Sequence, residues 1–128
     1  MNLSNSIALQ RYYLQTAAKR KRNFMPKALL FVESKPASPE QVDEYHAWHE
    51  QTHIPEMLSV EGFLSARRWQ SDDKESFVTL YEIDSDVDIA RANLKAALTG
   101  GRMSKPVAVQ TDPPPVMRYL TFIDEATC

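Results

Sequence analysis

The three histidines of this chain, His46, His49 and His53, all lie within eight residues, in the stretch "HAWHEQTH". Residues 49–53 read His-Glu-x-x-His. Zinc peptidases use this pattern to place two metal-binding imidazoles one helical turn apart, with the glutamate as general base. The pattern therefore raises the question of whether the chain binds zinc or uses its imidazoles in another way.

A helical wheel argues against the peptidase. At about 100° per residue, Glu50 falls on the side opposite the apolar arc and points to solvent. No histidine remains as a third ligand, and Pro55 is expected to end regular helix soon after His53. Only carboxylates such as Glu56, Asp72 and Glu75 remain to complete a site, so we expect no functional metal. The apolar arc, which must face the sheet, contains Val42, Tyr45, His46, Trp48, His49, Thr52 and His53.

Two explanations for the histidine cluster remain open: hydrogen bonding within the packed core, and chemistry in a polar cavity. A single histidine on an apolar face usually makes only hydrogen bonds. Burying three titratable groups together is costly unless they have partners. A polar cavity used for chemistry explains such a cluster better than packing alone.

The elements that must position these residues follow from local patterns. Ser38, Pro39 and Gln41 form a predicted capping box, and Ser85 and Gly100 are expected to begin and end a second helix. In the strand "GFLSARRWQ", strict alternation places Phe63, Ser65, Arg67 and Trp69 on one face. The predicted order is strand, helix, strand, strand, helix, strand, over residues 27–34, 38–53, 62–70, 76–84, 85–100 and 116–124.

This order predicts an α+β, ferredoxin-like fold: a four-stranded antiparallel sheet with both helices on one face. The strands carry large apolar residues on both alternations, for example Leu120 against Tyr119. The helices cover only one face, so the other needs a second cover. A second copy of the sheet is the simplest cover, and it predicts a homodimer.

Composition sets further bounds. The 128 residues fit one domain, 26–128, preceded by a basic extension over residues 1–25 that is expected to be helical. Residues 1–27 carry +6 of a net charge of −2, so the body carries −8 and is not a nucleic-acid-binding domain. Three interpretations of the extension remain open. It resembles an organelle transit peptide, and its "KRKR" resembles a nuclear signal. It would otherwise be an arm that packs on the body or on a partner. A single cysteine, Cys128, fits the cytoplasm, and no apolar run approaches a membrane span.

The stretch "HAWHEQTHIPEMLSVEGFLSARRWQ", with "FVTLYEID" and "RYLTFID" after it, resembles the EthD-like branch of the dimeric α+β-barrel superfamily over about residues 27–125. The resemblance implies sheet-to-sheet dimers and a pocket between helices and sheet, with His53 at the pocket. His49 replaces a tyrosine that many members have, so His-Glu-x-x-His is expected to be accidental. The residues that match are Trp48, His53, Ile54, Pro55, Gly62, Phe63, Arg67 and Trp69.

Members similar to this chain include polyketide cyclases, decarboxylases, dehydratases and lactone isomerases. We therefore expect an enzyme without a cofactor, of lyase, isomerase or cyclase type, acting on a small hydrophobic oxygenated ring compound. His53, then His49, would remove a proton. Tyr45, Tyr81 or His46 would bind the developing oxyanion. Trp48, Phe63 and Trp69 would form apolar walls, and Arg67 would bind a carboxylate or join an ion pair.

Two other classes remain as rivals. A non-catalytic small-molecule carrier needs the pocket but not the histidines. A haem or metal protein would use His49 or His53 as a ligand, and a cofactor-free monooxygenase is a more distant relative.

Overall fold

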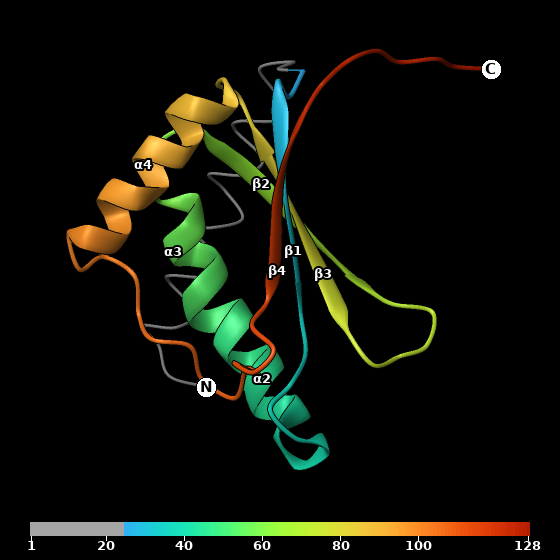
Figure 1. Cartoon of the computed structure of the whole chain (residues 1–128), viewed down its shortest axis with the longest axis vertical. Coiled ribbons are helices and arrows are strands. Elements are labelled where there is room, and N and C mark those ends of the chain that lie inside the picture. Colours follow the sequence, from blue (N-terminus) through green and yellow to red (C-terminus); the bar gives the residue numbers. More distant parts are fainter. Residues whose placement is uncertain (1–24) are drawn as a thin grey trace.

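The computed structural model describes residues 25–128, so the predicted extension, residues 1–25, lies outside them except for Met25. The order of elements is the predicted one (Figure 1). The elements are β1 (Ala28–Ser34), a 3₁₀ turn η1 (Pro39–Gln41), α2 (Val42–Trp48), a π-helical turn η2 (His49–His53), α3 (Ile54–Leu58), β2 (Phe63–Gln70), β3 (Phe77–Ile83), α4 (Val87–Thr99) and β4 (Val116–Thr121). Among the described residues, no helix is both long and apolar enough to cross a membrane.

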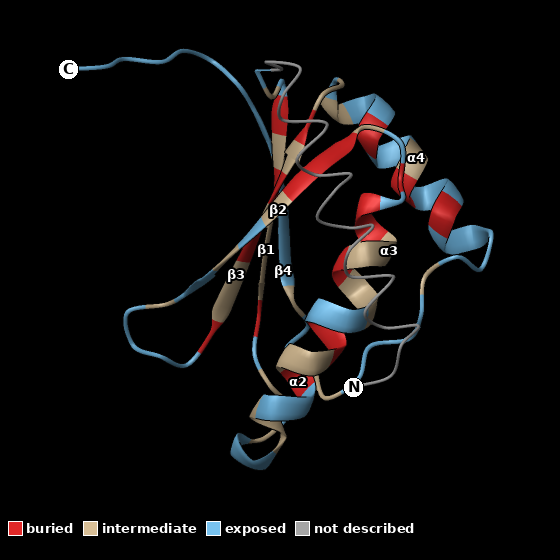
Figure 2. Ribbon diagram, turned by 180° about the vertical axis from the view of Figure 1, so that it is seen from behind, coloured by how far each residue is buried: buried red, intermediate tan, exposed pale blue. Residues whose placement is uncertain are grey.

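The four strands form one antiparallel sheet in the order β2-β3-β1-β4, and the helices lie on one side of it (Figure 1). This arrangement confirms the α+β, ferredoxin-like fold. Leu30 pairs with Tyr81 of β3 and Tyr119 of β4, and all three point toward the helices. The core lies between this sheet face and the inner sides of α3 and α4 (Figure 2).

The sequence predicts that α4 turns a stripe of Val87, Ala90, Leu94, Ala97 and Leu98 inward, and the structure largely confirms it. Ala90, Leu94 and Ala97 are buried and Val87 packs against the core, whereas Leu98 is exposed. The cap of this helix differs from the prediction, because the Ser85 hydroxyl donates to the Asp86 carbonyl and Asp86 takes the cap position.

The start of the first helix also differs from the predicted capping box. The Ser38 hydroxyl donates to the side-chain oxygen of Gln41 at 3.0 Å, while the Gln41 amide donates to the Ser38 carbonyl at 3.1 Å. The hydroxyl therefore does not cap an amide, and a 3₁₀ turn precedes α2.

Pro55 does not end the first helix, contrary to expectation. The helix widens into the π-helical turn η2 and continues as α3 to Leu58. The Ile54 amide donates to the His49 carbonyl, five residues back. A proline lacks the amide hydrogen and its ring crowds the preceding turn. A wider turn just before it lets the chain stay helical.

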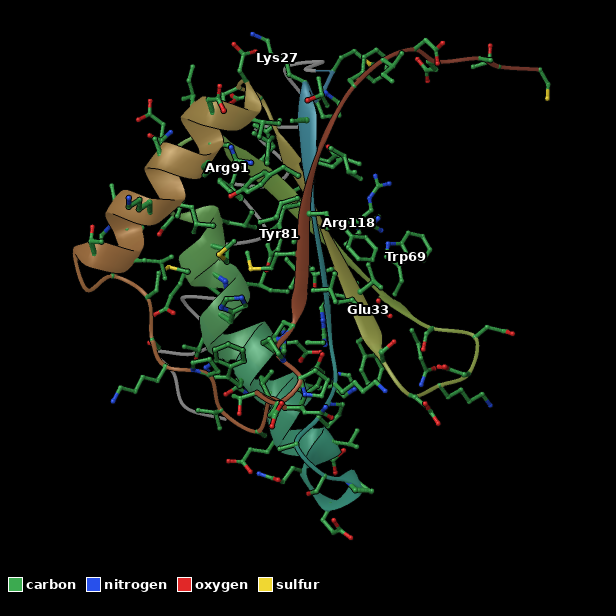
Figure 3. All side chains as sticks on the ribbon, in the orientation of Figure 1. Lys27, Glu33, Trp69, Tyr81, Arg91 and Arg118 are labelled. Carbon is green, nitrogen blue, oxygen red and sulfur yellow. The ribbon has the colours of Figure 1, made fainter. Side chains whose placement is uncertain are left out.

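A β-bulge near the start of β2 changes which side chains face the helices. Phe63 pairs with Ile83, but the next pair is Ser65 with Glu82, so Leu64 is an extra residue. One extra residue reverses the alternation from that point on. Arg67 and Trp69 therefore lie on the face away from the helices, and Figure 3 shows Trp69 on that side. The prediction that both share a face with Phe63 is wrong.

The sheet face away from the helices, here called the outer face, is mostly apolar. Within residues 25–128 no element covers it (Figure 1). Trp69, Val116 and Leu120 are 54%, 50% and 41% exposed. Patches of this kind usually mark an interaction site, and we propose a second copy of the chain as its partner. The apolar residues of the outer face are Leu29, Phe31, Trp69, Val78, Leu80, Val116 and Leu120.

The proposed dimer makes a testable prediction. Leu80 lies near the middle of the outer face, in register with Phe31 and Arg67. The replacement Leu80→Asp places a charge in the interface and should weaken association by at least about tenfold. Sedimentation equilibrium measures the change. Ile89→Asp, on an exposed position of α4, is the matched control and should keep the dimer. A wild-type monomer at micromolar concentration would contradict the proposal.

Candidate active site

A cavity of about 240 Å³ lies between the first helix, the sheet and the segment that leads to β4. The helix contributes Trp48, His49, His53 and Met57 to its wall. The opposite side is formed by β1 and β4, through Val32, Ser34 and Met117. Leu94, Leu98, Met103 and Val109 are among the residues that close the remaining sides. The wall is therefore largely apolar, with a few polar groups that converge on it.

His49 has a defined hydrogen-bonding state. Its side chain is 5% exposed, and its Nδ1 lies 2.8 Å from the Tyr45 carbonyl oxygen. A carbonyl oxygen only accepts hydrogen bonds, so Nδ1 must carry the hydrogen. In the neutral ring, Nε2 then holds a lone pair. His49 is thus a proton acceptor in the wall of the cavity.

His53 is held mainly by its neighbours' rings. It stacks on Trp48, with centroids 4.5 Å apart and planes 14° apart, and meets His49 edge-on at 5.6 Å. In a regular α-helix, residues five apart would point about 140° away from each other. The π-helical turn brings Trp48 and His53 together. Within residues 25–128 no group hydrogen-bonds the His53 ring, so these residues do not fix its tautomer.

Burial keeps both cavity histidines neutral. It lowers the pKa of His49 to about 4, against the opposing effect of its bond to Tyr45 and with a further lowering by the Arg68 charge. Burial, and then the charge of Arg68, lower the pKa of His53 to about 4. At neutral pH both rings are therefore uncharged and able to accept a proton.

Tyr45 does not line the cavity directly but contacts residues that do. It is 1% exposed, and its hydroxyl lies 2.6 Å from the Ser34 hydroxyl. Burial raises the pKa of Tyr45, while the Ser34 hydrogen bond and the Arg68 charge oppose the rise. The phenol is therefore a hydrogen-bonding group rather than an anion.

His46 lies outside the wall of the cavity and contacts Arg68 instead. Arg68 donates from Nη2 to His46 Nδ1 at 3.0 Å, so this ring carries its hydrogen on Nε2. Burial and the Arg68 charge lower the pKa of His46. Arg68 was missed in the sequence because the bulge in β2 cannot be seen in a strict alternation.

The other predicted binding residues are separated by the fold. Of these, only Trp48 lines the cavity. Phe63 and Tyr81 are fully buried in the core, with ring centroids 6.0 Å apart. Arg67 lies on the outer face and forms an ion pair with Glu82 at 3.9 Å. That ion pair is the alternative that the sequence offered for Arg67, and Trp69 lies on the same face.

The metal interpretation finds no support in the geometry. Glu50 is exposed, on the side away from the cavity that His49 and His53 line. His49 Nδ1 is already bonded to the Tyr45 carbonyl. In the part of the chain that the structure describes, no group of three or more His, Cys, Asp or Glu side chains is placed to hold a metal ion.

The comparisons with known proteins found a similarity in structure. No protein-family model matches this chain, and no curated protein sequence matches it. Among solved structures it is similar to a crystal structure of a monooxygenase from the gene ActVA-Orf6 of Streptomyces coelicolor, in complex with the ligand nanaomycin D. The match covers 80% of this chain and 93% of that chain, with a TM-score of 0.51 and 16% identity. The two chains share a fold. The narrower resemblance to EthD-like proteins stays a prediction.

The low pKa values predict how stability depends on pH. An unperturbed histidine titrates near 6.5, whereas His49 and His53 titrate at about 4 in the folded chain. Between these values the unfolded chain binds more protons. The free energy of unfolding should therefore be highest above about pH 6.5 and should fall as the pH drops toward 4. Thermal unfolding from pH 7 to pH 4 measures the fall, and His49→Gln should reduce it. Ring NMR signals of His49 or His53 that titrate near pH 6.5 would contradict the burial argument.

Proposed function

We propose that this protein is an enzyme that removes a proton from a small, largely apolar, oxygen-bearing ring compound, without needing a cofactor. The observation that carries the proposal is the neutral His49 ring in the cavity wall, with Nδ1 occupied and Nε2 able to accept. The sequence favoured His53 as the base. We place His49 first because its tautomer is fixed, and keep His53 as the second candidate.

The size and lining of the cavity support this class of substrate. An apolar cavity of roughly 150 Å³ holds benzene, so about 240 Å³ suits a molecule of one or two rings. The apolar walls bind the ring by burial. The few polar groups are on His49, His53, Trp48, Ser34 and Ser104, and the Ser104 hydroxyl already donates to Glu56. The others suit a ligand with one or two oxygen atoms.

The low pKa of His49 ties proton transfer to the substrate. Burial disfavours an isolated imidazolium, so the His49 ring is not protonated by water at neutral pH. A substrate that becomes an anion beside the ring changes this, because opposite charges attract strongly in a poorly solvated site. The proton acceptor should therefore work on substrates whose anion is spread onto an oxygen, as in an enolate or phenolate.

The reaction that follows the proton transfer has two candidates. A lyase, isomerase or cyclase reaction needs only proton transfer and rearrangement of the carbon skeleton, as the EthD-like resemblance suggests. A monooxygenase reaction is the second candidate, because the structurally similar protein is a monooxygenase that binds nanaomycin D. Both begin with an electron-rich anion in the cavity. Activity that persists under nitrogen supports the first, and uptake of molecular oxygen supports the second.

A hydrogen-exchange assay tests the proposed base without knowledge of the product. The bicyclic ketone β-tetralone, in deuterium oxide, reports proton removal next to its carbonyl group by NMR. The protein should accelerate the exchange, and His49→Gln should reduce the acceleration by ~10²–10⁴-fold. His53→Gln should have a smaller effect if His53 only packs on Trp48.

The control for this assay is Glu50→Gln. Glu50 is exposed, so this change should leave the exchange rate within a few fold. Loss of exchange in the folded Glu50→Gln variant would instead favour a peptidase-like use of His-Glu-x-x-His. Binding of β-tetralone or nanaomycin D without any exchange or oxygen uptake, unaffected by the histidine variants, would favour the carrier.

A further inference from the structure

Ser34 brings a hydroxyl group into the cavity, and proton transfer to His49 does not by itself use it. Ser34 is the last residue of β1 and lies on the helix-facing side with Leu30 and Val32. It is 8% exposed and lines the same cavity as His49. The two polar groups come from different layers, His49 from the helix and Ser34 from the sheet. A ring compound in the cavity would contact both.

The hydroxyl groups of Ser34 and Tyr45 share one short hydrogen bond, 2.6 Å long, in which either can be the donor. Each hydroxyl has one hydrogen to donate. If Tyr45 donates, the hydrogen of Ser34 is available to a ligand in the cavity. If Ser34 donates, the Tyr45 hydrogen is left with the Ser34 carbonyl, at a long 3.4 Å. The first arrangement makes the better use of both donors.

Arg68 favours the same arrangement. Its guanidinium carbon lies 5.8 Å from the centre of the Tyr45 ring, and its charge acts on the Tyr45 hydroxyl. Among the described residues no carboxylate forms an ion pair with Arg68. A nearby cation attracts the lone pairs of the Tyr45 oxygen, which turns the hydroxyl hydrogen toward Ser34. The Ser34 hydrogen is then directed away from Tyr45.

We propose that Ser34 donates a hydrogen bond to the substrate oxygen that becomes negative, and that Tyr45 and Arg68 are positioning residues for this donor. The inference rests on the proposed function, because it concerns the same cavity and the same proton transfer. His49 Nε2 takes the proton from carbon, and the electron pair of that bond moves onto the oxygen as an enolate. Ser34 stabilises the new charge with a hydrogen bond already in place. The substrate class is therefore a ring ketone or lactone, or a phenol that loses the proton from its oxygen instead of from carbon.

Two ligands that differ in one group test the role of Ser34 in binding. Para-nitrophenolate carries a charged oxygen, and nitrobenzene has the same ring and nitro group without it. The replacement Ser34→Ala should weaken binding of para-nitrophenolate by about 10- to 100-fold, as expected for a hydrogen bond to a charged group. Binding of nitrobenzene should be almost unchanged. Titration calorimetry, at a pH where para-nitrophenol is ionised, measures both affinities.

Two further variants make the test specific. Ser65→Ala is the matched control: Ser65 is another buried serine, in β2, and is not part of the cavity wall. It should leave both affinities unchanged. Tyr45→Phe keeps the ring and the carbonyl that holds His49, but removes the bond that directs Ser34. It should reduce para-nitrophenolate binding by less than Ser34→Ala. In the exchange assay, Ser34→Ala should lower kcat more than it raises KM.

The outcomes separate this inference from the proposed function. If Ser34→Ala binds para-nitrophenolate as tightly as the wild type, the role of Ser34 is overturned, while proton removal by His49 still stands on its own assay. If Ser34→Ala does not fold, undiminished binding by Tyr45→Phe overturns the inference in the same way. If the wild type binds neither ligand, the cavity does not accept such rings, and both proposals fail.

Discussion

Tyr45 joins two polar groups on opposite sides of the cavity, and most of the site depends on it. Its carbonyl group holds the His49 ring from the helix, and its hydroxyl holds Ser34 of the sheet. Its ring also packs against Phe77 and lies beside Arg68. A buried hydroxyl left without a partner costs about 1–3 kcal/mol. Helix and sheet are therefore held in one relative position, which also sets the positions of the two polar groups.

The low exposure of the histidines links the stability of the fold to its chemistry. The core accepts His49 because the ring is neutral and its Nδ1 hydrogen has a partner. The same burial makes a lone imidazolium unfavourable, so the ring charges readily only beside a compensating anion. Water in the cavity provides no such anion, whereas a bound enolate does. Selectivity for oxygen-bearing rings would then come from the burial of His49 as much as from any direct contact.

The sequence was sufficient for the fold because its patterns repeat over several residues. Runs of apolar, β-branched and aromatic residues located the strands, and the apolar stripe from Val87 to Leu98 located α4. The site was harder to predict from the sequence because two local irregularities depart from the regular repeat. They are the bulge at Leu64 and the π-helical turn before Pro55. The bulge exchanged Arg67 for Arg68 at the site. Met103 and Val109 reach the cavity from a long connection, and no local pattern predicts where such a segment packs.

The bulge in β2 also has an evolutionary consequence. One additional residue, Leu64, decides that Arg68 faces the helices while Arg67 and Trp69 face outward. Without the bulge, regular pairing of Leu64 would place every residue after it on the opposite face. Deletion of Leu64 would instead remove the bulge and leave Ser65 opposite Glu82, so the residues that follow would keep their present faces. A bulged strand of this kind can therefore lose one residue without exchanging the side chains of its two faces.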